Sequence, residues 1–261
     1  MPSQSLSHYF ITSTDGEPES YTTAFVEAVS HGVVSGVHIP DSSAPVPDEV
    51  LSRLQPEEKT LADEMRAYRQ VSWTGGRLAL HTAVRSLGER GDAVPAGPRG
   101  EPVLPRGIAG SVSHKRKLAV AIAARSSHGT IGIDLEDLGP PRKGIAERVL
   151  LPEELAAVAE LPEDRQWISI VLRFSIKEAI YKALHPHVRR FVDFSEACVT
   201  PDVDGTAQVE MRLARDEGPF KVEAFYYWLP GQVLSTVRIR TKRRGRRGSE
   251  PPPAEAPADD S

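Results

Sequence analysis

Two segments in different halves of the chain share one pattern, and this repetition most constrains the fold. Residues 73–83 align without gaps to residues 174–184, and in this register Arg77 takes the place of Glu178. Each segment predicts a long helix and follows an earlier helix start, at 54–58 and at 151–154, with an early proline and acids in the first turn. Chance similarity is the alternative explanation for so short an alignment.

Strand-like runs follow each predicted long helix, at 110–114 and 117–124 in the first half and at 221–228 and 232–240 in the second. Two halves with the same order predict an α+β fold with a pseudo-twofold axis, a small antiparallel sheet on a long helix in each half, and an active site between them. We expect an N-terminal half at 1–128, a C-terminal half at 129–241 and a disordered low-complexity tail at 242–261.

Two acids lie on a predicted strand near the junction of the halves. Residues 130–136 alternate, so Asp134 and Glu136 leave one face while Ile133 and Leu135 point into a core. The preceding run at 117–124 and a short glycine-containing loop predict that this strand forms a hairpin with it. A surface strand whose acids face water is the alternative for this motif alone.

A helix predicted at 174–182 carries the complementary groups. Lys177, Glu178, Tyr181 and Lys182 fall on adjoining parts of its surface. Three carboxylates and two ammonium groups that converge would suit Mg²⁺ and a diphosphate. The alternative is an ordinary surface pair of Glu178 with Lys182, worth about 0.3–0.5 kcal/mol.

Further groups in the first half could bind phosphate or a base. His114, at a strand end after Ser113, can donate to a phosphate oxygen, although such a histidine is more often a structural hydrogen bonder. Arg69 and Arg77 lie about two helical turns apart and could present two guanidinium groups, or belong to a solvated helix face. The Pro/Gly loop at 95–105 could border a purine or act only as a linker.

Composition indicates a cytoplasmic protein without a membrane segment. No apolar run approaches the ~20 residues that span a bilayer, the N-terminus lacks a secretory pattern, and Cys198 is the single cysteine. The net charge of −4 includes basic clusters that suit an anionic ligand and an acidic partner, or that are merely solvated. The basic run at 242–247 could bind nucleic acid, but no aromatic residue is interleaved with it, which favours a solubilising tail.

Together, the motifs resemble the 4′-phosphopantetheinyl transferases, in the larger, monomeric, pseudo-dimeric subclass that serves polyketide, nonribosomal-peptide and siderophore carrier proteins. The resemblance is carried by 100–105 (GEPVLP), 110–114 (GSVSH), 132–136 (GIDLE) and 174–182 (FSIKEAIYK). It is detailed from Arg66 to Leu184 and looser through Arg240. Glu101, which carries no positive charge, and Leu104, which stands where related chains often carry Trp, depart from the family pattern.

The resemblance implies a role for each matching residue. Mg²⁺, which Mn²⁺ could replace, would be held by Asp134, Glu136 and Glu178, and the catalytic residues would be Glu178, Asp134 and Lys182. Coenzyme A would be bound through its phosphates by Lys177 and Lys182, on its 3′-phosphate side by Arg69, Arg77, Ser113 and His114, and along its adenine by Arg99, Gly100, Glu101 and Pro102.

The implied reaction moves the 4′-phosphopantetheine arm of coenzyme A to a serine hydroxyl of an apo acyl- or peptidyl-carrier protein, giving holo-carrier and 3′,5′-ADP. Glu178, or a water ordered by the metal, would accept the serine proton. Because carrier proteins are typically acidic beside that serine, the expected docking contacts are basic: Arg142, Lys143, Arg189 and Arg190.

Two other functions remain open on the residues alone. The same acids could serve a Mg²⁺-dependent phosphohydrolase or nuclease, although neither needs the Ser-His motif or the adenine-type loop. A non-catalytic protein that binds nucleic acid or carriers through 242–247 is the third reading, and nucleic acid is not the expected partner. The particular carrier proteins served are left undetermined.

Overall fold

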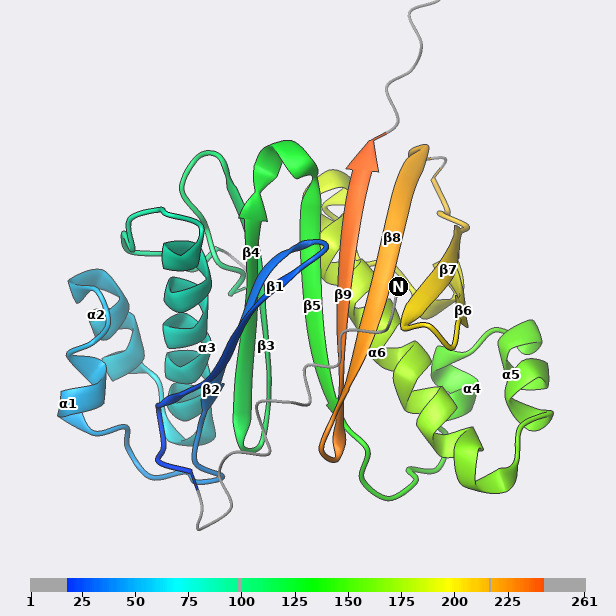
Figure 1. Ribbon diagram of the computed structural model, residues 1–261, viewed down its shortest axis with the longest axis horizontal. Helices are drawn as coiled ribbons and strands as arrows, with labels where there is room; N and C mark the ends of the chain where they lie inside the picture. Colours follow the sequence, from blue (N-terminus) through cyan, green and yellow to red (C-terminus); the bar gives the residue numbers. More distant parts are fainter. Residues whose placement is uncertain (1–17, 98–99, 216, 242–261) are drawn as a thin grey trace, which may run out of the picture.

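The computed structural model describes residues 18–97, 100–215 and 217–241, which build two antiparallel sheets (Figure 1). The first sheet has the order β1-β2-β4-β3 and the second the order β5-β9-β8-β7-β6. The first contains β1 (Thr23–Val29), β2 (Gly32–His38), β3 (Ile108–Lys115) and β4 (Leu118–Arg125). The second contains β5 (Thr130–Asp137), β6 (Ala197–Pro201), β7 (Thr206–Met211), β8 (Phe220–Leu229) and β9 (Gln232–Thr241).

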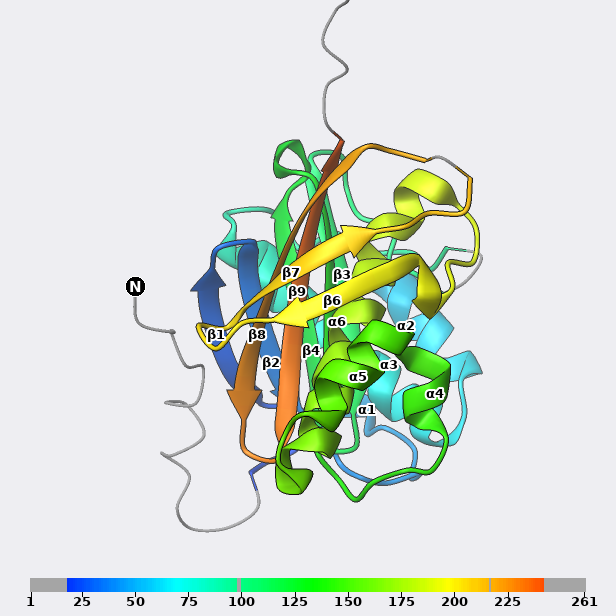
Figure 2. The same ribbon diagram turned by 90° about the vertical axis from the view of Figure 1, so that its right-hand side faces the viewer.

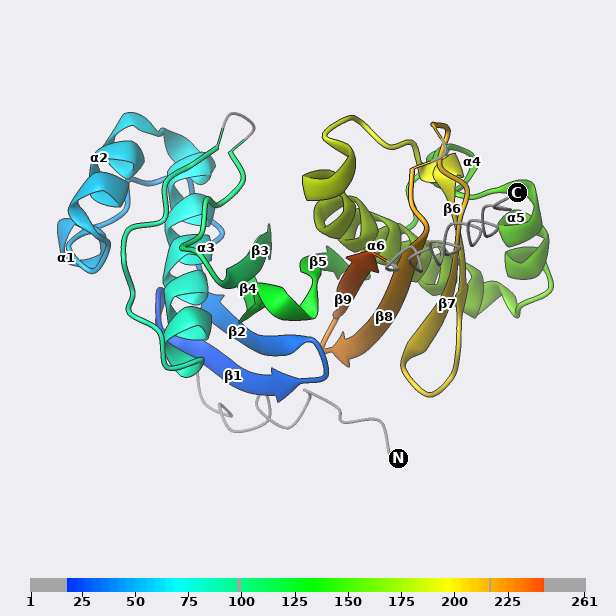
Figure 3. The ribbon, with the colours of Figure 1, turned by 90° about the horizontal axis from the view of Figure 1, so that it is seen from above.

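One long helix covers each sheet (Figures 1 and 3). Helix α3 (Ala67–Ser86) packs on β2 and β4, and α6 (Glu163–Val188) packs on β5 and β9. Short elements complete each half: α1 (Asp48–Leu51), α2 (Pro56–Glu64), α4 (Ile145–Val149), α5 (Pro152–Ala159) and two single 3₁₀ turns, η2 (Ser126–His128) and η3 (Phe194–Glu196). Figure 2 faces the C-terminal half, where α4 and α5 lie beside α6.

Alternation along the central strands divides the core into layers. On β4, Ala119 and Ala121 face the core beneath α3, whereas Val120 and Ile122 belong to a core shared with Ile133 of β5. Because successive side chains leave opposite faces of a strand, one strand can line two cores. The predicted α+β fold with two similar halves is therefore confirmed.

The predicted hairpin between the runs at 117–124 and 130–136 is wrong. Strand β4 lies between β2 and β3, so both of its edges are already paired and none is left for β5. After η2, Gly129, with a φ of 113°, lets the chain turn away, and β5 pairs instead with β9 in the second sheet. The two strands are consecutive in the chain but belong to different sheets.

The seam between the halves runs along β3 and β5. No backbone ladder joins these two strands in the described part of the chain. Instead the Ser111 hydroxyl accepts a hydrogen bond from the Ile133 amide (3.2 Å), and the Ser113 hydroxyl accepts one from the Leu135 amide (3.3 Å). These bonds satisfy buried amides on the free edge of β5.

Predicted boundaries and tail have different outcomes. The first sheet ends at Arg125 and the second begins at Thr130, while the division into domains at 128/129 stays a prediction. The expected tail at 242–261 lies outside the described residues. Among the described helices, none combines the length and apolarity that crossing a bilayer requires.

Gly132 sets how closely β5 approaches α6. A Cβ at this position would lie 2.0 Å from the Ala179 carbonyl oxygen and 2.8 Å from the Ala183 amide nitrogen. Both are helix backbone atoms, which cannot swing aside as a flexible side chain could. Because residue 132 has no side chain, the face of β5 that bears Asp134 and Glu136 can pack directly against α6.

We predict that Gly132→Ala lowers the free energy of unfolding by about 3 kcal/mol, because the added methyl group forces strand and helix apart. Urea unfolding measures the change. Gly139→Ala is the matched control, since a Cβ there meets nothing within 4 Å, and should change stability by less than about 0.5 kcal/mol. Equal effects of the two substitutions would contradict the close-approach argument.

Candidate active site

Asp134 and Glu136 are both buried, 4% and 3% exposed, at the seam. Ile133 and Leu135 lie in the shared apolar core, so the predicted alternation along this strand is confirmed. One Asp134 oxygen, Oδ1, accepts hydrogen bonds from the Ser113 hydroxyl (3.0 Å) and from Lys182 Nζ (2.8 Å). One Glu136 oxygen, Oε1, pairs with Lys115 Nζ at 2.8 Å. Each acid is thus half neutralised by a lysine.

The second oxygen of each acid has no hydrogen-bond partner among the described residues. Asp134 Oδ2 and Glu136 Oε2 are both buried, although a buried carboxylate oxygen normally accepts a hydrogen bond. Burial, together with the negative charge of Asp134, raises the pKa of Glu136 above its ordinary value, and Lys115 partly offsets this. Both unpartnered oxygens are hard donors of the kind that Mg²⁺ or Mn²⁺ binds, and Glu136 Oε2 also has the Arg142 guanidinium 3.9 Å away.

Glu178 is half-buried on α6, facing the same charges. Its pKa is raised by burial and then by the charge of Asp134, while Lys182 and Lys115 act in the opposite direction. Nevertheless, no three His, Cys, Asp or Glu side chains of the described chain are arranged to hold a metal ion. The three predicted ligands do not form a ready-made shell, so the metal site stays a proposal.

The two predicted phosphate-binding lysines of α6 point to different places. Lys182 Nζ donates to the Ile133 carbonyl (2.9 Å) and to Asp134, at the seam. Lys177 Nζ is buried on the other side of the helix and donates to Val149 O (2.8 Å), Glu154 Oε2 (2.6 Å) and Phe194 O (3.0 Å). The prediction that Lys177 contacts phosphate is wrong, because five residues turn the helix by about 140°.

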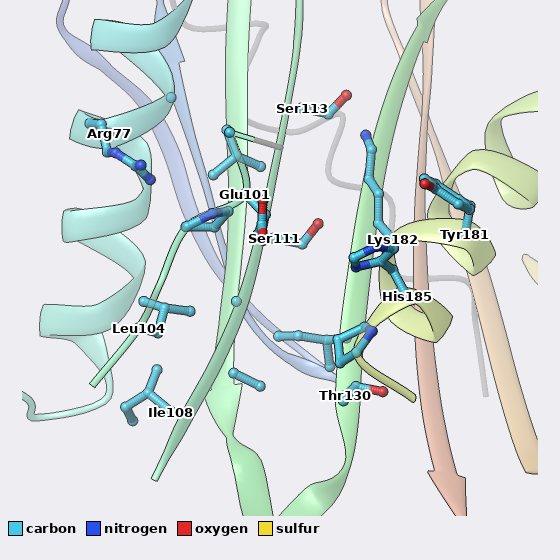
Figure 4. A pocket seen from close by; sticks show the side chains of 18 of the residues that line it. Arg77, Glu101, Leu104, Ile108, Ser111, Ser113, Thr130, Tyr181, Lys182 and His185 are labelled. Atoms are coloured by element: carbon cyan, nitrogen blue, oxygen red, sulfur yellow. The ribbon is translucent and has the colours of Figure 1, made fainter. Parts of the chain in front are cut away.

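A cavity of about 740 Å³ opens beside the acids, between α3 and α6 (Figure 4). Figure 4 shows Arg77 on one wall, Lys182, Tyr181 and His185 on the other, and Ser111 and Ser113 between them. The structure brings eight of the predicted binding residues to this cavity: Arg69, Arg77, Gly100, Glu101, Pro102, Ser113, His114 and Lys182. Arg99 lies outside the described residues.

Arg77 is held rigidly in the cavity wall. Its guanidinium carbon lies 4.8 Å from the ring centroid of Trp73, and its Nε lies 3.8 Å from Glu58 Oε1. Glu58 is fully buried and also contacts His81 Nε2 at 2.7 Å. Packing on an aromatic face and pairing with a fixed acid keep a buried guanidinium in one orientation. The cavity therefore receives a positioned positive charge.

His114 contributes a donor without a full charge. Burial lowers its pKa, and the positive charges of Lys182, Lys115 and Arg69 lower it further. Near neutral pH its ring is therefore mostly uncharged, and one nitrogen can donate a hydrogen bond. Arg69, Arg77 and Lys182 supply the positive charge around it, which suits a polyanionic ligand.

Known proteins share these sequence features. The 4′-phosphopantetheinyl transferase superfamily model matches residues 130–237, and the model of the 4′-phosphopantetheinyl transferase N-terminal domain matches residues 57–124. The 4′-phosphopantetheinyl transferase Npt of Nocardia iowensis is 32% identical over 59% of this chain and 70% of its own length. The chain belongs to the 4′-phosphopantetheinyl transferase superfamily.

Two further known proteins are similar to this chain. The 4′-phosphopantetheinyl transferase Svp of Streptomyces mobaraensis is 33% identical over 60% of this chain, and the match spans 65% of that relative. A crystal structure of Helicobacter pylori holo-[acyl-carrier-protein] synthase in complex with coenzyme A matches 42% of this chain and all of that chain, at 19% identity and a TM-score of 0.35. The predicted larger subclass of the superfamily is confirmed by the sequence relatives.

A second cavity, of about 1180 Å³, lies at the other end of the seam in this superfamily member. His114 lines both cavities. Along β5, Thr130 borders the first cavity and Asp137 the second, so Asp134 and Glu136 lie between them. The charged residues that border the second cavity are four lysines and arginines (Lys115, Arg116, Lys117 and Arg142) and two acids (Asp41 and Asp137).

The basic residues expected to dock a carrier have different surroundings. Arg142 borders the second cavity, and its guanidinium lies 3.9 Å from Glu136 Oε2. Lys143 and Arg189 are exposed, and neither takes part in the hydrogen bonds and ion pairs described above for the site. Arg190 pairs with Glu196 (2.6 Å) and Glu217 (2.7 Å), and its role as a docking contact stays a prediction. An ion pair inside the protein already occupies its guanidinium.

Lys115 contacts a predicted site acid but was not among the predicted site residues, and neither were Ser111 and His185. The only signal for Lys115 was its place in the basic run after His114, which also fits a solvated turn. Its contact with Glu136 depends on β3 and β5 lying side by side, and the sequence gives no sign of that pairing.

We predict that Lys177→Met lowers the free energy of unfolding by about 3–5 kcal/mol, because it leaves Glu154 buried without its cation. Thermal or urea unfolding measures the loss. The control is Lys221→Met, which removes an exposed lysine paired with Glu223 at 3.0 Å and should cost about 0–1 kcal/mol. Normal stability of Lys177→Met with a weakened affinity for coenzyme A would instead support the phosphate contact.

Proposed function

We propose that this protein transfers the 4′-phosphopantetheine arm of coenzyme A to a serine hydroxyl of an apo acyl- or peptidyl-carrier protein, with release of 3′,5′-ADP and with dependence on Mg²⁺. The observation that carries the proposal is one continuous seam: a cation-lined cavity, two buried acids with free oxygens, and a second, basic cavity. Membership of the superfamily supports this activity.

Coenzyme A is assigned to the first cavity. Arg69, Arg77 and the neutral imidazole of His114 would bind its 3′-phosphate side, and Gly100 to Pro102 would border the adenine. Lys182 lies where this cavity meets Asp134, so its ammonium is placed for the diphosphate. Guanidinium and ammonium groups form short, charge-assisted hydrogen bonds to phosphate oxygens.

Asp134 and Glu136 are assigned to the metal, through Oδ2 and Oε2, with Glu178 as the third candidate ligand. A Mg²⁺ or Mn²⁺ ion bound there would neutralise the negative charge of the diphosphate. The protein's contribution is to keep both carboxylates buried and oriented, through Ser113 and Lys182 on one side and Lys115 on the other.

Glu178 is the proposed base. The serine oxygen attacks the phosphorus that carries the pantetheine arm, the bond from that phosphorus to the diphosphate bridging oxygen breaks, and the serine proton moves to the Glu178 carboxylate. A carboxylate whose pKa burial has raised accepts a proton more readily. Lys182 would stabilise the charge that develops on the transferred phosphoryl group.

The carrier protein is assigned to the second cavity. The proposed acceptor has an acidic surface, and Arg116 and Arg142 give this cavity the complementary sign. Donor and acceptor would then approach the acids from opposite ends of the seam. Both sides of the site come from one chain, with Arg69 and Arg77 before the seam and Glu178 and Lys182 after it, which supports action as a monomer.

Incubation of a purified apo-carrier protein with coenzyme A, Mg²⁺ and this protein should add the mass of one phosphopantetheine to the carrier. Asp134→Ala should abolish the gain, because it removes both a free oxygen and the partner of Lys182. Intact-protein mass spectrometry measures the product, and 3′,5′-ADP should appear only with carrier present. Hydrolysis of coenzyme A without carrier would favour a phosphohydrolase instead.

Two exposed arginines should separate the donor and acceptor sides. Arg69→Met should lower kcat/KM for coenzyme A about tenfold, the size expected from one charge-assisted contact, with little effect on the KM for carrier. Arg142→Glu should do the reverse. Steady-state kinetics with each substrate varied in turn measures both. Reversed effects, or equal effects on both substrates, would contradict the assignment of the two cavities.

A further inference from the structure

Lys115 places a cation on one of the proposed metal ligands. It is the last residue of β3, and its Nζ lies 2.8 Å from Glu136 Oε1. The Glu136 side chain is 5% exposed, whereas that of Lys115 is 30% exposed. The partly exposed Lys115 side chain thus extends from the second cavity to the buried carboxylate of Glu136.

The two lysines at the acids are held differently. Lys182 donates to a backbone carbonyl, Ile133 O, as well as to Asp134, so its departure would break two hydrogen bonds, although Asp134 Oδ1 would keep the Ser113 hydroxyl as a donor. Lys115 makes a single ion pair among the described interactions, with Glu136. Lys115 can therefore leave its acid by giving up one contact and turning into the second cavity, which it borders.

Lys115 and a divalent ion would compete for Glu136. Both are cations that need the same carboxylate, and like charges a few ångströms apart in a half-buried site repel strongly. The diphosphate of the donor changes this balance, because its negative charges can accept the displaced ammonium or offset its field. The protein should therefore bind the divalent ion more weakly when the ion is alone than when the diphosphate is bound with it.

We propose that Lys115 is a built-in competitor for the divalent cation. It neutralises Glu136 in the ligand-free protein, weakens binding of the cation alone, and turns toward the second cavity when the cation enters together with the coenzyme A diphosphate. Lys115 is then a positioning residue that favours joint loading of metal and donor. The proposal rests on the metal role of Asp134 and Glu136 in the proposed function.

The test is Mn²⁺ binding to the full chain, followed by the electron paramagnetic resonance signal of free aqueous Mn²⁺, with and without coenzyme A. Without coenzyme A, Lys115→Met should bind Mn²⁺ about five- to tenfold more tightly than the parent protein, the effect of removing one partly exposed competing charge. With coenzyme A, the gain should be smaller. Lys115→Arg, which keeps the cation, should bind as weakly as the parent.

Lys117→Met is the matched control, since it removes the same charge two residues away on an exposed turn. It should change the Mn²⁺ affinity by less than about twofold, because solvent screens exposed charges. Equal shifts for Lys115→Met and Lys117→Met, or no shift for either, would overturn the proposal. Equal shifts would mean that Lys115 acts only through its general electrostatic field, and no shift would mean that it does not affect binding of the ion.

Asp134→Asn separates failure of this proposal from failure of the proposed function. If Asp134→Asn abolishes Mn²⁺ binding while Lys115→Met leaves it unchanged, the metal site stands and the competition by Lys115 is refuted. If the parent protein binds no Mn²⁺ even with coenzyme A, or if Asp134→Asn binds it normally, the metal assignment fails and the Lys115 proposal fails with it.

Discussion

Two serine hydroxyls on β3 join the halves, and the site depends on the spacing that they set. Ser111 and Ser113 accept hydrogen bonds from the Ile133 and Leu135 amides, which the second sheet leaves without a strand partner. Ser113 also donates to Asp134 Oδ1, so one residue both closes the seam and orients an acid of the candidate site. An apolar residue at either position would leave a buried amide unsatisfied.

A buried glutamate organises each half in the same way. Glu58 accepts from the Gln55 and Val94 amides and contacts His81, tying the start of α2 to a following loop and to α3. Glu154 accepts from the Leu151 and Val199 amides and from Lys177, tying α5 to β6 and α6. Removing any one of these donors would destabilise the junction, because the carboxylate would stay buried with part of its desolvation cost uncompensated.

The halves differ in what they do with their charged side chains. In the first half Glu58 lies close to Arg77, whose guanidinium lines the first cavity. In the second half the corresponding acid, Glu154, forms a buried ion pair with Lys177. The second half instead presents Asp134, Glu136, Glu178 and Lys182 to the seam. A shared framework thus holds a ligand-binding side and an acid-bearing side.

Much of the local structure could be predicted because it depends on short-range periodicity. The alternation at 130–136 placed Asp134 and Glu136 on one face, and the repeat of 73–83 in 174–184 located both long helices. The predictions of the hairpin and of a phosphate contact for Lys177 failed for other reasons. Both edges of β4 were already paired, and the turn of α6 between residues 177 and 182 carried Lys177 away from the seam to Glu154.

By itself, the sequence determined which residues can carry the chemistry and to which side of their own strand or helix they point, because those directions follow from backbone geometry. Only the tertiary structure decided that β3 would lie beside β5, that Lys182 rather than Lys177 would reach Asp134, and that Lys115 would reach Glu136. These contacts join segments far apart in the chain, and packing and free strand edges choose them rather than any local pattern.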